Sequence, residues 1–149
     1  MSASDVASAL QTINATITGI TTAPTEMPGH LDTAQLPCAL AYPGPAEHSD
    51  ASYTHLRSDR TWLIRVYVKP LGQGRGVDEG YQECLPFLHY FATEYITQEH
   101  TSNTAWECLH YTGDNGVRAD MTLHNADTGE YYWGVEFTVL VTQFTESSA

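Results

Sequence analysis

A long alternating segment near the C-terminus constrains the fold more than any other feature of this sequence. Between Glu130 and Phe144, apolar side chains occupy every second position: Tyr131, Trp133, Val135, Phe137, Val139 and Val141. Successive side chains of a β-strand point to opposite faces of its sheet, so this spacing predicts one strand with a continuous apolar face. Gly134, inside this segment, predicts a bend or a bulge. A strand of this length is expected to run across a small sheet or beyond it.

Two earlier segments also predict strands. The segment Trp62–Lys69 alternates in the same way, and its apolar face consists of Trp62, Ile64, Val66 and Val68. The short apolar run Cys38–Tyr42 predicts a strand that ends at the following Pro-Gly-Pro sequence. Residues 43–58 are polar and rich in turn formers, so we interpret them as a loop. The alternative is that residues 52–56 pair as the outer arm of a long hairpin.

Two segments have helical periodicity. Near the N-terminus, Ser4 is in position to cap a helix that Gly19 ends, and its apolar side chains are Val6, Leu10, Ile13 and Ile17. The second predicted helix is Asp78–Gln98, in which Pro86 indicates a kink or the true start. Its apolar stripe consists of Val77, Tyr81, Leu85, Leu88, Phe91, Ala92 and Tyr95. The proline-containing segment 21–37 between the first helix and the first strand predicts an extended connection.

The C-terminal third predicts a meander of strands at Thr104–Thr112, Val117–His124 and Glu130–Phe144. The connecting sequences Gly-Asp-Asn-Gly (113–116) and Asn-Ala-Asp-Thr-Gly (125–129) supply residues that tolerate the positive φ of hairpin turns. The helices are separate from the strands in sequence, which is typical of α+β proteins. We therefore expect an α+β fold with a mostly antiparallel sheet of about five strands and two helices packed on it.

Length and charge limit the functions that this chain can have. Its 149 residues predict a single domain, residues 1–149, with a short disordered tail at 145–149. Six basic and 18 acidic residues give a net charge of −12, which argues against tight binding to a nucleic-acid backbone. Met1–Leu10 has no basic residue ahead of a long apolar run, so it predicts neither a signal peptide nor a membrane span. We expect a soluble protein that is made in the cytoplasm and has no membrane partner.

The glycine-rich segment Gly72, Gln73, Gly74, Arg75 and Gly76 resembles a phosphate-binding loop only superficially. A nucleotide-hydrolase loop requires Lys and Ser or Thr after its last glycine, and a dinucleotide fingerprint requires a different glycine spacing in a βαβ unit. The sequence has neither feature. We interpret the segment as a connection between a strand and a helix, with no bound cofactor.

Other candidate chemistry is equally weak in the sequence. His110 and His124 end adjacent predicted strands near Asp114 and Asp127, but no metal-binding spacing supports a metal site there. There is no Gly-x-Ser-x-Gly nucleophile motif. The three cysteines, Cys38, Cys84 and Cys108, are widely separated and predict buried, reduced thiols. We therefore expect no metal and no enzymatic activity.

The order and texture of the segments resemble those of a known protein family. They comprise an amphipathic N-terminal helix, LPCALAYPGP (36–45), WLIRVYVKPLGQGRG (62–76), a helix, and a closing meander with YWGVEFTVLV (132–141). This arrangement, from about Val6 to Phe144, is similar to that of the tail terminator, or tail completion, proteins of long-tailed bacteriophages. The strong acidity and the seven histidines depart from the pattern of that family.

The resemblance implies a structural role in virus assembly. Proteins of this family form a homo-hexameric ring that caps the tail tube, stops its polymerisation and joins the tail to the head connector. The implied partners are other copies of this chain, the major tail tube protein and the head-tail connector, in a virion assembled in the cytoplasm of a host bacterium. DNA would pass through the ring, and an acidic wall would not retain it. Gly72–Gly76 would then be an assembly loop, in which Arg75 pairs with an acidic residue of a neighbour.

Two alternatives follow from the same observations. The chain can be another head-to-tail connector or a tail tube subunit. From a different class, it can be a small-molecule-binding α+β domain whose ligand contacts are Trp106, Tyr111, Tyr132 and Trp133. A ring former assembles, whereas a ligand-binding domain is expected to be monomeric or dimeric.

Overall fold

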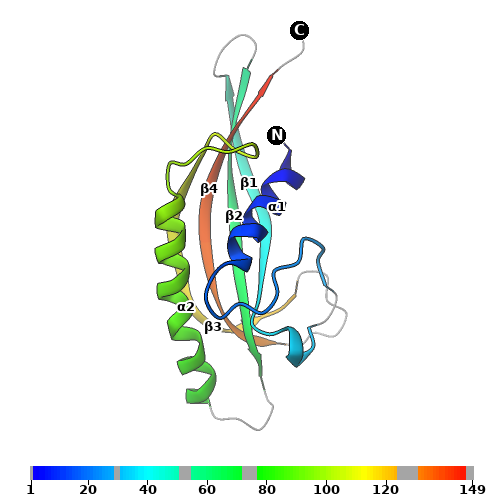
Figure 1. The fold of residues 1–149 in the computed structure, drawn as a ribbon, viewed down its shortest axis with the longest axis vertical. Helices are drawn as coiled ribbons and strands as arrows, with labels where there is room; N and C mark the ends of the chain where they lie inside the picture. The colour runs from blue at the N-terminus through cyan, green and yellow to red at the C-terminus, as the bar shows by residue number, and fades with distance from the viewer. Residues whose placement is uncertain (1, 29–30, 51–54, 72–76, 124–130, 147–149) are drawn as a thin grey trace.

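The computed structural model describes residues 2–28, 31–50, 55–71, 77–123 and 131–146 (Figure 1). The elements in chain order are α1 (Ala3–Ala15), a 3₁₀ turn (Thr33–Gln35), β1 (Cys38–Asp50), β2 (His55–Pro70), α2 (Val77–Gln98), β3 (Cys108–Met121) and β4 (Tyr132–Glu146). Within these ranges, the four strands form one antiparallel sheet in the order β1-β2-β4-β3. The predicted α+β class is confirmed, but the sheet has four strands where about five were expected.

The apolar face predicted from alternation forms the main core. Eight of the predicted residues on this face are buried: Trp62, Ile64, Val66, Val68, Val135, Phe137, Val139 and Val141. The other two differ, because Trp133 is only partly buried against the cluster and Tyr131, just before β4, is exposed. The rings of Phe91 in α2 and Phe137 in β4 stack with their centroids 4.9 Å apart. Val6 and Leu10 of α1 join the same cluster. Both helices therefore pack on the sheet face that the sequence identified (Figure 1).

The strand β1 is much longer than predicted because Pro-Gly-Pro does not end it. It pairs with β2 as far as Asp50, with a bulge between Pro43 and Ala46, so the interpretation of 43–58 as a loop is wrong. Ala39 donates its N–H to the Thr22 carbonyl and accepts from the Gln11 side chain, so its backbone points away from β2. Two-residue periodicity then directs Pro43 away from β2 as well. There its missing N–H removes no hydrogen bond from the ladder.

The strand β3 also continues through a segment predicted to be a turn. Gly-Asp-Asn-Gly lies within β3, where the register with β4 shifts between Tyr111 and Gly113 and again between Asp114 and Val117. Gly113 and Gly116 have φ angles of +136° and +77°. These positive φ angles therefore occur in β-bulges and not in a hairpin turn. The predicted strands Thr104–Thr112 and Val117–His124 form the single strand β3. The second predicted turn, 125–129, lies outside the described residues.

Helix α2 buries part of the expected stripe. Phe91 and Tyr95 are buried and Leu88 packs against the core, but Tyr81 is exposed and Leu85 is half-buried. The other buried positions of the helix are Gly80, Cys84 and Phe87. A Cβ atom at Gly80 would lie 2.6 Å from the indole of Trp133, so the glycine lets the start of the helix approach β4 closely. Pro86 lies inside the helix and does not end it.

Helix α1 is capped by Ser2, two residues earlier than the predicted cap, Ser4. The side chain of Ser2 accepts from the Asp5 N–H at 3.2 Å, and the Asp5 carboxylate accepts from the Ser2 N–H at 3.1 Å. This capping box satisfies two backbone donors, so Ser4 lies within the helix. The helix ends at Ala15, before Gly19, which has a φ of +90°.

A buried chain of hydrogen bonds joins α2, α1 and β1. The Tyr95 hydroxyl donates to Asn14 Oδ1 at 2.6 Å, and Asn14 Nδ2 donates to Gln11 Oε1 at 2.8 Å. Gln11 Nε2 in turn donates to the Ala39 carbonyl at 2.9 Å. These polar groups are satisfied inside the core, so they fix the position of α1 relative to α2 and to the edge strand β1.

The opposite face of the sheet carries a smaller apolar cluster. Its buried members are Leu31, Cys38, Leu40, Tyr42, Tyr67, Met121, Leu123 and Tyr132. Leu31 comes from the connection between α1 and β1, where Thr21 also donates its N–H to the Pro37 carbonyl. Part of the predicted extended connection therefore folds over this face of the sheet.

The sheet extends beyond the helices at one end. Figure 1 shows the adjoining ends of β1 and β2, together with the end of β4, projecting past α1 and α2. His55 pairs with Glu146 there, so β4 reaches two residues into the expected tail at 145–149, and residues 147–149 lie outside the described ranges. The end of β2 and the start of α2 lie at the opposite end of the molecule (Figure 1). None of the helices in the described ranges combines the length and the apolar character needed to cross a bilayer.

Candidate functional site

The predicted assembly loop, Gly72–Gly76, lies outside the described residues, but its two attachment points are described. Leu71, directly after β2, donates its N–H to the Tyr131 carbonyl at 3.0 Å. Lys69 Nζ lies 3.1 Å from Glu79 and 2.6 Å from Glu83, both in the first turns of α2. Because Lys69 is largely buried, its two ion pairs connect the end of β2 to the start of α2. The two segments that flank the loop, the end of β2 and the start of α2, are therefore connected to each other. We call this region the loop base.

Large apolar side chains are exposed at this base. Leu71 is 37% exposed and its hydrogen-bond partner Tyr131 is 53% exposed. Tyr81, near the start of α2, is also exposed. Exposed apolar residues that occur together beside a connecting loop are typical of protein–protein contact surfaces, in which tyrosine is enriched. We call Leu71 and Tyr131 the loop-base pair.

The basic residues of the described segments already have partners within the chain. The contacts are Arg57 with Asp59, Arg60 with the Gly44 carbonyl, Arg65 with Glu136, Lys69 with Glu79 and Glu83, and Arg118 with Asp120. The sixth basic residue, Arg75, lies outside the described ranges. Cations that neutralise neighbouring carboxylates contribute little attraction for phosphate. The ion pairs thus add to the charge argument against a nucleic-acid site.

A polar network crosses the sheet face opposite the helices. Glu136 is buried and accepts from Arg65 Nε at 2.7 Å and from Asn115 Nδ2 at 2.5 Å. Arg118 lies 3.6 Å from the same carboxylate. Burial opposes the charge of Arg65, but its hydrogen bonds with Glu136 and Tyr67 outweigh this effect and raise the pKa of the guanidinium. The buried Glu136 carboxylate of β4 thus has partners in both neighbouring strands, which links the register of β2, β4 and β3.

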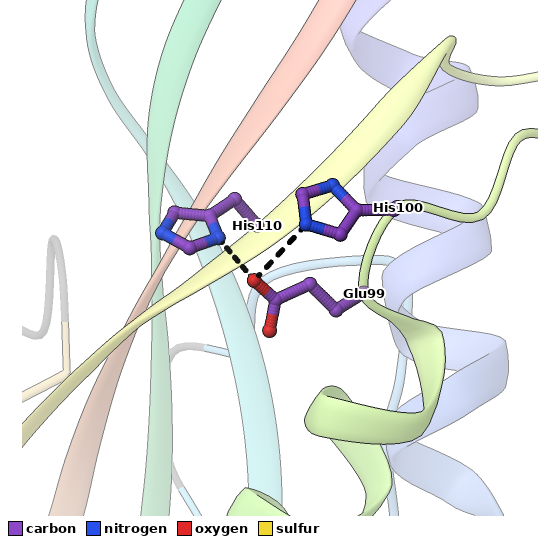
Figure 2. A group of neighbouring side chains, drawn as sticks. All are labelled: Glu99, His100 and His110. Atoms are coloured by element: carbon purple, nitrogen blue, oxygen red, sulfur yellow. Dashed lines mark hydrogen bonds and ion pairs between the residues drawn. The ribbon is translucent and has the colours of Figure 1, made fainter.

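Three potential metal ligands lie close together: Glu99 and His100, directly after α2, and His110 in β3. Figure 2 shows the Glu99 carboxylate between the imidazoles of His100 and His110. Glu99 accepts a hydrogen bond from His110 Nδ1, and the same carboxylate oxygen lies 3.6 Å from His100 Nε2. Sequence spacing paired His110 with His124 instead, and His124 lies outside the described residues. The only sequence signal for this group was a Glu-His pair at the end of a helix, which is too common to identify a site.

The two buried cysteines are poor nucleophiles in this fold. Cys38 and Cys84 are buried, Cys108 is half-buried, and all three are free thiols. Burial, with the Glu83 carboxylate adding to it, raises the pKa of Cys84 to about 12. Burial also raises the pKa of Cys38, although a hydrogen bond with Thr22 opposes the shift. Because the thiolate is the nucleophilic form, neither buried cysteine is activated at neutral pH.

The four aromatic residues considered for ligand binding do not form a common site. Trp106 is buried in the helix-covered core and donates its Nε1–H to the Thr101 carbonyl at 3.1 Å. Tyr132 is buried in the other cluster, edge-on to Tyr67. A shallow groove of about 180 Å³ lies elsewhere, between the end of α1 and residues 89–94 of α2. This volume is below the roughly 300–1,000 Å³ of typical ligand pockets.

Comparison with known proteins does not assign a family. No protein-family model matches this chain, and no curated protein sequence matches it. The function is therefore inferred from the order of the elements and from the contacts described above.

Proposed function

We propose that this chain is a tail terminator protein of a long-tailed bacteriophage. Copies of it form a ring that caps the tail tube, ends tail polymerisation and joins the tail to the head connector. The observation that carries this proposal is the surface around the predicted assembly loop. There, the exposed loop-base pair Leu71 and Tyr131 adjoins a glycine-rich segment that contains Arg75.

The shape of the subunit supports assembly into a ring. A cyclic ring uses heterologous contacts, in which one patch of a subunit meets a different patch of its neighbour. The projecting strand ends and the base of the assembly loop lie at opposite ends of the molecule (Figure 1). These two surfaces differ in structure, so they suit a head-to-tail contact between copies. A hexamer is the ring that the family resemblance implies.

Charge supports the same proposal. The chain has 18 acidic and six basic residues, and five of the basic residues are paired within the chain. Acidic residues of one copy are thus available in excess to meet Arg75 of the next copy. DNA that passes through such a ring meets a surface that does not bind phosphate.

The three structural roles, tail terminator, tube subunit and connector, predict different tails when the protein is absent. If the protein terminates tails, removing it from an infected cell should give tails of uncontrolled, excessive length. If it is a tube subunit, no tails should form, and if it is a connector, tails of normal length should fail to join heads. Electron microscopy of lysates distinguishes these results. The small-molecule alternative has no support in the described residues, because Trp106 and Tyr132 are buried in separate clusters.

Reversing the charge of Arg75 tests the assembly loop. We expect Arg75→Glu to leave the melting temperature of the monomer unchanged and to lower the fraction of protein in rings. Reversing one partner of a desolvated interfacial pair costs at least about 2 kcal/mol, whereas an exposed loop charge contributes about 0–1 kcal/mol. Size-exclusion chromatography with light scattering measures the ring fraction, and complementation measures tail length.

The matched control for this experiment is Arg75→Lys. It changes the same residue of the loop but keeps the positive charge that is expected to meet an acidic neighbour. The control is expected to retain more assembly than Arg75→Glu. Equal ring fractions and normal tails for both variants and the parent would show that the loop takes no part in assembly.

Replacing the loop-base pair tests the apolar part of the same surface. We expect the double variant Leu71→Ser, Tyr131→Ser to fold normally, because both side chains are exposed in the monomer, and to assemble weakly. Ile96→Ser is the control, since Ile96 is 59% exposed on α2 away from the loop base. Analytical ultracentrifugation over a concentration series compares the association of the variants. Weakening by Ile96→Ser but not by the double variant would move the interface to α2.

A further inference from the structure

We propose that Glu99, His100 and His110 form a binding site for one divalent transition-metal ion, with Zn²⁺ as the best match. The three residues supply two imidazole nitrogens and a carboxylate oxygen, and these atoms all lie within 4.8 Å of one another. Figure 2 shows one nitrogen of each imidazole directed at the same carboxylate oxygen of Glu99. A set of two histidines and one carboxylate is a known zinc ligand set that leaves a coordination position open.

The separations between ligand atoms suit a small cation. With metal–ligand bonds of about 2.0–2.1 Å and tetrahedral angles, ligand atoms lie roughly 3.4 Å apart. Glu99 Oε1 and His100 Nε2 are 3.6 Å apart. The carboxylate also accepts a hydrogen bond from His110 Nδ1. When a metal takes the place of this proton, the neutral imidazole of His110 carries its proton on Nε2 and ligates through Nδ1. The two side chains must then move apart to admit the ion.

The backbone around the site is already held in place. His100 donates its N–H to the carbonyl of Leu109, the residue before His110, at 2.8 Å. His110 pairs with Leu140 of β4 within the sheet. The Thr101 carbonyl accepts from the buried indole of Trp106, which anchors the segment after His100. The two imidazoles therefore come from segments that are fixed relative to each other before any metal binds.

The exposure of the site suits reversible binding from solution. His100 and His110 are exposed, so an ion can reach all three ligands, and water can occupy the open position. Glu99 is mostly buried, which reduces the screening of its charge by solvent. This site is independent of the proposed ring and departs from the sequence-based expectation of no metal.

Titration of the full chain with Zn²⁺ tests the proposal. The protein should carry no polyhistidine tag and should be stripped of metal with a chelator beforehand. We expect one Zn²⁺ per chain, an increase in melting temperature on binding, and a visible absorption band when Co²⁺ replaces Zn²⁺. Each of Glu99→Gln, His100→Asn and His110→Gln should lower the affinity at least about tenfold. Asn is chosen at position 100 because His100 has a φ of +62°, which Asn tolerates.

Two further variants decide whether this cluster is the site. His89→Gln removes an exposed histidine from α2, the helix that precedes Glu99. His124→Gln removes the histidine that sequence spacing paired with His110. Both should bind Zn²⁺ as the parent does. Circular dichroism of the metal-free variants should match that of the parent, so that a loss of binding is not a loss of folding. The proposal is overturned if the parent binds no zinc, or if binding depends on His124 but not on His100.

Discussion

The substitution Phe137→Ala is expected to lower the free energy of unfolding by about 3–5 kcal/mol. Phe137 is 0% exposed, and its ring lies nearly parallel to that of Phe91, at an interplanar angle of 11°. Removing the ring leaves a cavity between β4 and α2, where the backbones of the sheet and the helix cannot close it fully. Urea denaturation followed by circular dichroism measures the change.

Ile96→Ala is a suitable control for this core substitution. Ile96 belongs to the same helix as Phe91 but is exposed, so its truncation should change stability by about 0.5 kcal/mol or less. A loss below about 1 kcal/mol for Phe137→Ala would contradict the packing of α2 on this face of the sheet.

Gly134→Ala is expected to be more damaging, with a loss of more than about 4 kcal/mol or failure to fold. A Cβ atom at Gly134 would lie 2.1 Å from the Val66 carbonyl oxygen and 2.9 Å from Met121 Cε. The carbonyl belongs to β2, the strand paired with β4, so relief requires the two central strands to separate. The yield of soluble protein and its urea denaturation midpoint provide the measurement.

Gly116→Asn is the control for the glycine substitution. A Cβ atom there would meet no atom within 4 Å, and Asn tolerates the φ of +77°. This variant should therefore remain close to the parent in stability. If Gly134→Ala were equally stable, the close approach of β4 to β2 at this position would be wrong.

Periodicity alone was enough to define the central strands. The alternation in Trp62–Lys69 and Glu130–Phe144 identified which side chains of β2 and β4 face the core, because the two-residue period leaves one choice of apolar face. Gly134 also indicated an irregularity, and the ladder shifts register on the facing strand between Tyr67 and Lys69. For helix α2, periodicity did not define a single buried side. Its sequence is apolar on more than one side, and the approach to Trp133 that Gly80 allows selects the buried side.

Two sequences that are typical of turns lie inside strands in this fold, each beside a long neighbouring strand. Pro-Gly-Pro and Gly-Asp-Asn-Gly both have the composition of chain breaks. In the fold, Pro43 lies on the outer edge of β1, and Gly113 and Gly116 lie in bulges opposite the continuous strand β4. Whether such residues end a strand or bend it depends on the hydrogen-bonding partner, and local sequence does not specify that partner.

The assembly loop and the proposed metal site also differ in what the sequence and the tertiary structure each determined. The sequence by itself determined the glycine-rich composition of 72–76 and the acidic charge of the chain, because both are properties of covalent structure. Only the tertiary structure brought Leu71 next to Tyr131, Arg65 next to Glu136, and Glu99 and His100 next to His110. In each case, strand register or a folded-back connection joins residues that are not neighbours in the sequence. The long-range backbone hydrogen bonds that set these positions arise from the packing of the whole sheet and its helices, which no local pattern encodes.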